Sequence, residues 1–76
     1  MNIKELDTVV MKVDLPSSGL KAGDIGAVVH VYSHDAIEVE FITASGHTQA
    51  LVTLYASQLR SVGPKDILAV RQLTAA

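Results

Sequence analysis

Three consecutive residues, Ser33, His34 and Asp35, carry the side-chain types of a hydrolytic triad. In a working triad the three side chains converge from separate parts of the fold, whereas the side chains of consecutive residues diverge. Serine and aspartate are also frequent turn residues. We therefore interpret this tripeptide as a turn, and we expect a protein that is not an enzyme and has no catalytic residues.

A metal site would have to combine His30, His34 and His47 with Glu38 or Glu40. No pair of these histidines has the spacing of ligands on one helix face, and the sequence contains no cysteine. We expect the histidines to be solvated or paired across strands. No metal and no other cofactor is predicted.

Two glycines, Gly23 and Gly26, resemble part of a phosphate-binding loop. Such loops lead into the N-terminus of a helix, whereas a strand pattern follows here. We interpret Gly23 as a turn residue with positive φ, and Gly26 as a bulge or a close backbone approach at a barrel corner.

Composition and charge restrict the remaining function classes. The chain has 76 residues, enough for one domain, and it is 49% hydrophobic and 18% charged with a formal net charge of -2. Its six Lys and Arg residues form no basic stripe, which disfavours nucleic-acid binding. The N-terminus lacks a secretory-signal pattern, and no apolar run reaches the length of a membrane span. We expect a cytoplasmic protein that does not contact the membrane.

Alternating apolar residues predict five short strands. The first spans residues 6–13, the second starts at Ile25, the third covers 37–42, a fourth includes 50–54, and a short fifth follows a 3₁₀ turn at 55–59. The residues expected to face inward are Val9, Met11, Val13, Ile25, Ala27, Val29, Val31, Ile37, Val39 and Phe41.

The lengths of the two tight turns can be predicted, because directly paired residues share a face of the sheet. The number of residues in each turn must bring inward residues of one strand opposite inward residues of the next. A three-residue loop at 33–35 places His30 opposite Glu38. A two-residue loop at Ser45-Gly46 pairs each inward residue of the third strand with an apolar residue of the fourth. These pairs are Phe41 with Ala50, Val39 with Val52, and Ile37 with Leu54.

Together these elements predict an all-β fold, a small five-stranded SH3-like barrel over residues 1–62 with a long first loop at 15–24. Gly63-Pro64 marks the start of a C-terminal tail, residues 63–76. The tail forms a short helix, an added strand or a disordered segment. If it is helical, Ile67, Val70 and Leu73 share one face, which docks on the barrel or on a partner.

Apolar residues on strand faces assigned to solvent suggest an interface if they are not covered by the protein itself. The tail is the natural segment to cover them, in its own subunit or in a neighbour. The candidate partner-binding surface consists of Val10, Val28, His30, Tyr32, Ile42, Leu51, Ile67, Val70 and Leu73.

Several segments of the chain have a familiar pattern. They are Leu-Asp-Thr-Val-Val (6–10), Asp-Leu-Pro (14–16), Gly-Leu-Lys-Ala-Gly-Asp-Ile-Gly-Ala-Val-Val-His-Val-Tyr (19–32), Glu-Val-Glu-Phe (38–41) and Gln-Leu-Arg-Ser-Val (58–62). With them the chain resembles the bacterial domain-of-unknown-function family 4926, small stand-alone proteins that look SH3-like. The resemblance covers nearly the whole length, although Ser61 stands where a proline is expected. It implies no catalytic residues, and it suggests a partner of neighbouring toxin-like or effector proteins.

The function predicted from the sequence is a non-enzymatic protein–protein interaction module that binds another protein or itself, with an antitoxin or immunity-type role as its specific version. The alternative is a KOW-like nucleic-acid or ribosome-associated module, because the Gly-x-x-Gly-x-Val core is similar to the KOW motif. Proteins with that motif are basic, and this chain is not.

Overall fold

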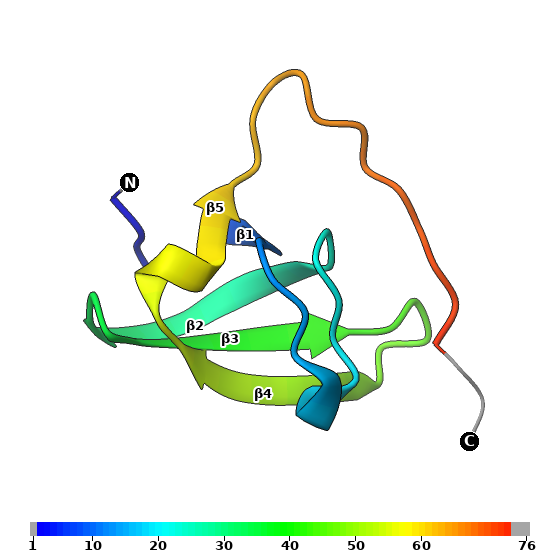
Figure 1. Ribbon diagram of the computed structural model, residues 1–76, viewed down its shortest axis with the longest axis horizontal. Coiled ribbons are helices and arrows are strands. Elements are labelled where there is room, and N and C mark those ends of the chain that lie inside the picture. The colour runs from blue at the N-terminus through cyan, green and yellow to red at the C-terminus, as the bar shows by residue number, and fades with distance from the viewer. Residues whose placement is uncertain (1, 74–76) are drawn as a thin grey trace.

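Five antiparallel strands form one curved sheet in the order β4-β3-β2-β1-β5 in the computed structural model, which describes residues 2–73 (Figure 1). The strands are β1 (Thr8–Met11), β2 (Ile25–Ser33), β3 (Ala36–Ile42), β4 (Thr48–Leu54) and β5 (Leu59–Ser61). Two 3₁₀ turns, η1 (Pro16–Ser18) and η2 (Ala56–Gln58), lie in the connections. The predicted all-β, five-stranded, barrel-like fold is confirmed, with the difference that the sheet is not closed. No helix within residues 2–73 is long and apolar enough to cross a membrane.

β3 forms the centre of the core. Its residues Ile37, Val39 and Phe41 are buried, as predicted. Their partners on β4 are the predicted Leu54, Val52 and Ala50. The other strands and the β1–β2 loop supply the remaining buried residues of the core cluster, which are Val9, Met11, Leu20, Val28, Leu54 and Leu59.

The turn between β3 and β4 is one residue longer than predicted. The N–H of Thr43 donates to the carbonyl oxygen of His47 (2.8 Å), and the N–H of Gly46 donates to that of Thr43 (2.9 Å). Gly46 has the positive φ that the turn requires, 86°. Gln49 is then an extra residue in β4. The longer turn and this bulge compensate, which preserves the predicted register in the core.

The faces predicted for the first half of β2 are wrong. Val28 is buried, whereas Ile25, Ala27 and Val29 are exposed. The physical reason is a bulge, because Val29 is an extra residue opposite β3 and reverses the alternation. Beyond the bulge the odd-numbered residues face inward as predicted, and Val31 packs against the core.

The second half of β2 confirms one pairing and corrects one turn. His30 lies opposite Glu38, as predicted. Ser33 pairs with Ala36, so the turn contains two residues instead of three. A second bulge at Tyr32 accounts for the difference.

β1 is shorter than the predicted strand over residues 6–13, and its faces differ from the prediction. Val13 lies beyond the strand and is 41% exposed, whereas Val10, expected in solvent, is only 5% exposed. Val10 pairs directly with Ile25 of β2 and with Arg60 of β5. Because paired residues share a face, these two side chains flank Val10 and shield it from water.

Residues 63–73 form no helix. After β5 this segment arches away from the sheet and returns beside the β3–β4 turn (Figure 1), where Arg71 reaches Asp24 and Gly19 of the β1–β2 loop. A single turn, with a hydrogen bond from the N–H of Asp66 to the carbonyl of Gly63 (3.1 Å), begins the segment. The helical alternative for the tail is therefore wrong over these residues. Residues 74–76 of the predicted tail, and Met1 of the predicted barrel, lie outside the described residues.

Gly26 lies where the backbone of β2 packs closely against two core side chains of β3. A Cβ atom at Gly26 would lie 2.6 Å from Cγ1 of Val39 and 2.8 Å from Cε1 of Phe41. Carbon atoms do not approach so closely without displacement, so no other residue fits here unless the core shifts. The close approach predicted for this glycine is confirmed.

We expect G26A to lower the free energy of unfolding by about 1–3 kcal/mol, because the added methyl group overpacks a filled core. Denaturant unfolding measures this change. The matched control G63A adds the same methyl group where the nearest heavy atom is 3.5 Å away, Oδ2 of Asp66. It should change stability by less than about 0.5 kcal/mol. Equal stability of G26A and the wild type would contradict the close approach of β2 to β3.

Candidate functional site

The structure separates the nine residues of the predicted interface into three groups. Val10 and Val28 are buried, and their assignment to a partner surface is wrong. His30 and Tyr32 are exposed near the β2–β3 turn. The remaining five, Ile42, Leu51, Ile67, Val70 and Leu73, are exposed on the β3–β4 hairpin and the tail.

His30 and Tyr32 form a small cluster of their own. Their rings meet edge to face with centroids 4.4 Å apart. Nδ1 of His30 lies 2.9 Å from Oε1 of Glu5. The β2–β3 turn that this cluster adjoins is at the opposite end of β3 from Ile42, so the cluster and the tail do not make one surface.

Two arginine–aspartate pairs hold the tail. Near its start, Nη1 and Nη2 of Arg60 donate to Oδ2 and Oδ1 of Asp66 at 2.8 and 3.0 Å. Near its end, Nε and Nη2 of Arg71 donate to Oδ1 and Oδ2 of Asp24 at 2.7 and 2.6 Å. Nη2 of Arg71 also donates to the carbonyl oxygen of Gly19 at 2.9 Å. Both pairs have the two-pronged geometry that makes arginine–carboxylate contacts directional.

The β1–β2 loop positions the acceptors for Arg71. Oδ2 of Asp24 also accepts the backbone N–H of Lys21 (2.9 Å), which fixes the carboxylate. Gly23, with φ of 96°, and Gly19, with φ of 70°, supply the left-handed turns on either side. The predicted positive φ of Gly23 is confirmed. The loop therefore presents a carboxylate and a carbonyl oxygen to one guanidinium group.

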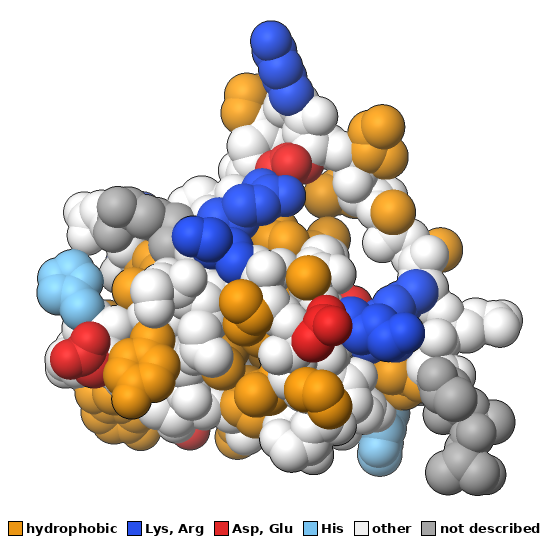
Figure 2. Space-filling model, in the orientation of Figure 1, with side chains coloured by type: hydrophobic (Ala, Val, Ile, Leu, Met, Phe, Trp, Pro, Cys, Tyr) orange, Lys and Arg blue, Asp and Glu red, His pale blue; other side chains and the backbone are white. Residues whose placement is uncertain are grey.

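We call residues 67–70, which lie between the two ion pairs, the strap. Its large side chains point into solvent: Ile67 is 90% exposed, Leu68 67% and Val70 100%. Its backbone makes no hydrogen bond to any other of residues 2–73. Figure 2 shows apolar side chains along the strap and an opening between the strap and the sheet. The strap is thus an extended apolar segment held away from the core.

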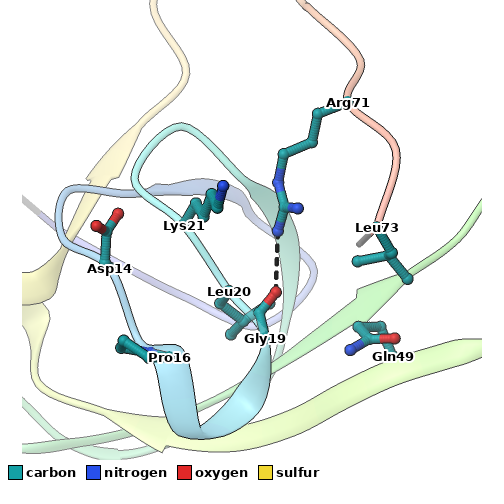
Figure 3. Close-up of a pocket in the computed structure, with 8 residues that line it drawn as sticks. All are labelled: Asp14, Pro16, Gly19, Leu20, Lys21, Gln49, Arg71 and Leu73. Carbon is teal, nitrogen blue, oxygen red and sulfur yellow. Dashed lines mark hydrogen bonds between the residues drawn. The ribbon is translucent and has the colours of Figure 1, made fainter. Parts of the chain in front are cut away.

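Two grooves lie on either side of the point where the tail returns. The first, the anchor groove, has a volume of ≈ 320 Å³ and is lined by Asp14, Pro16, Gly19, Leu20, Lys21, Gln49, Arg71 and Leu73 (Figure 3). The second, the strap groove, has a volume of ≈ 590 Å³ and runs under residues 69–73 along the start of β2 and the end of β3. It includes Ile42 of the predicted surface. Arg71 and Leu73 line both grooves.

Hydrogen bonding shifts the pKa values of the two arginine–aspartate pairs. The side-chain hydrogen bond from Arg71 lowers the pKa of Asp24, against the effect of burial, and the contact raises the pKa of Arg71. The pKa of Asp66 is lowered in the same way by Arg60. Neither arginine is among the site residues predicted from the sequence. No group of three or more metal-binding side chains gathers anywhere in the described part of the chain.

Comparison with protein families gives one result: the family model described as "Domain of unknown function (DUF4926)" matches residues 5–61. This range covers all five strands and ends before the tail. Neither the curated proteins nor the solved structures contain a match.

We expect the pKa of Asp24 to rise in R71A while the pKa of Asp66 stays low, and the reverse in R60A. The hydrogen bond from Arg71 lowers the pKa of Asp24 when the tail is docked. Docking is therefore most favourable where Asp24 is ionised in both states, and it is lost as the pH falls through the lowered pKa. Carbon NMR titration of the carboxyl groups measures both residues in one sample. The same Asp24 pKa in R71A and in the wild type would show that the tail is not docked.

Proposed function

The chain belongs to the DUF4926 family, and we propose that it is a non-enzymatic protein-interaction module that binds a protein partner through its strap. The observation that carries this proposal is the exposure of Ile67, Leu68 and Val70 on a segment anchored at both ends. Exposed apolar clusters on small domains are typical of interaction sites.

The backbone of the strap supports the same proposal. An extended segment with unpaired N–H and C=O groups can join the edge of a partner's sheet as an added strand. The two ion pairs hold the segment in an extended form before binding, which reduces the conformational entropy lost on association. A partner would thus bind both the apolar side chains and the main chain.

Charge favours a protein partner over the nucleic-acid alternative. The chain has a net charge of -2, and both of its arginines are paired with aspartates. Phosphate binding would have to break these pairs. The specific version of the proposal is occlusion, in which the strap covers a functional surface of an effector-like partner in the cytoplasm.

Photo-cross-linking from position 67 tests the proposal. A chain that carries a photoreactive amino acid in place of Ile67 is irradiated in an extract of the cells that naturally produce it, and adducts are identified by mass spectrometry. The control places the same group at Asp35, an exposed residue in the β2–β3 turn. We expect a defined protein adduct from position 67 that position 35 does not give. Identical adducts from both positions, or none, would overturn the proposal.

A further inference from the structure

The anchor groove has the chemistry of a receptor for a short peptide with an arginine. The carbonyl oxygen of Gly19, which lines this groove, and the carboxylate of Asp24, which lines the adjoining strap groove, receive three hydrogen bonds from the guanidinium group of Arg71. Asp14 adds a second negative charge that favours a cation there. The apolar part of the groove contains Leu20 and Pro16. A segment that fits must carry arginine with an apolar residue close by.

The tail supplies such a segment in Arg71-Gln72-Leu73. Figure 3 shows Arg71 reaching Gly19 and Leu73 lying beside Gln49. The contact between Arg71 and Asp24 joins residues 47 positions apart in the sequence. The strap makes no backbone hydrogen bond to the rest of the described chain, so the hydrogen bonds of Arg71 do not depend on backbone pairing along the path by which the tail arrives.

We infer that the anchor groove binds the tail of a second copy of this chain, so that two chains exchange their tails reciprocally. This inference rests on the proposed function and names its partner. The exchanged contacts are the same ones that a single chain makes, so no complementarity has to be created. Asp14 and Asp24 outnumber Lys21 around this site, so its charge is complementary to that of Arg71 in the tail.

The strap gains more from exchange than from return to its own chain. To return, it arches outward and leaves Ile67, Leu68 and Val70 in water. In a two-fold exchange the two straps pass each other in opposite directions, where they can bury these side chains and pair their free backbone groups. The eight residues from Pro64 to Arg71 span about 26 Å when extended. This reach is comparable with the 34 × 27 × 21 Å extents of the chain.

A charge-reversal experiment tests the inference with two variants. D24R disables the groove and leaves the tail intact, whereas R71D disables the tail and leaves the groove intact. We expect the wild type to have about twice the chain mass of 8.1 kDa by light scattering, and each variant to be a monomer. An equimolar mixture should recover the dimer, because each chain supplies what the other lacks. Contacts within one chain cannot be restored by mixing.

Two further variants complete the design, and a milder pair stands in reserve. K65D reverses a charge in the tail outside both grooves and should remain dimeric. The double variant D24R/R71D restores opposite charges and should also dimerise, and circular dichroism shows that each variant is folded. The milder pair D24N and R71Q replaces the charge reversals if either of them unfolds. A wild type that is monomeric up to millimolar concentration overturns the inference, as do a mixture that stays monomeric and single variants that stay dimeric.

Failure here is distinguishable from failure of the proposed function. A monomeric wild type whose position 67 still cross-links to a different protein excludes the second copy and retains the interaction role. A dimer restored by mixing, together with self-adducts from position 67, supports both.

Discussion

The close approach of β2 to β3 at Gly26 is the constraint on which the other features of this fold depend. The side chains of Val39 and Phe41 occupy the space of the missing Cβ. β2 can therefore lie against the core here while it pairs with β1 on one side and β3 on the other. Asp24 lies two residues earlier, where its carbonyl oxygen accepts the N–H of Met11 and its carboxylate accepts the N–H of Lys21. The acceptor for the tail is therefore next in the chain to this point of close packing.

The sequence predicts the β3–β4 hairpin well because its pattern is unambiguous. Ile37, Val39 and Phe41 alternate with polar glutamates, so only one face can be buried. β2 has apolar residues at both odd and even positions, and alternation then carries no information about which set is inward. The extra residue at Val29 shifts the alternation, so that the even-numbered Val28 faces the core before the bulge and the odd-numbered Val31 faces it after the bulge. The close contact predicted for Gly26 was itself a signal of the correct phase.

The candidate site was predicted only in part, and the reason lies in the range of its interactions. Ile67, Val70 and Leu73 were identified from their spacing, which is helical, yet the segment is extended. A helix of about three turns is marginal unless it buries its apolar face, whereas the segment observed here pairs Asp66 with Arg60 and Arg71 with Asp24. No local pattern relates Arg71 to Asp24, because their contact depends on the path of the whole barrel.

The two arginine–aspartate pairs also determine how easily the strap can leave its own chain and bind a partner. Both ion pairs are partly exposed to solvent, and such pairs contribute little net stability and weaken with salt. They can therefore release the tail at small cost, while the core, which contains neither arginine, stays intact. A segment joined to a rigid barrel by weak, directional contacts is ordered enough to present its apolar residues and free enough to leave its own groove. Binding and release at the tail are thus separated from the stability of the fold.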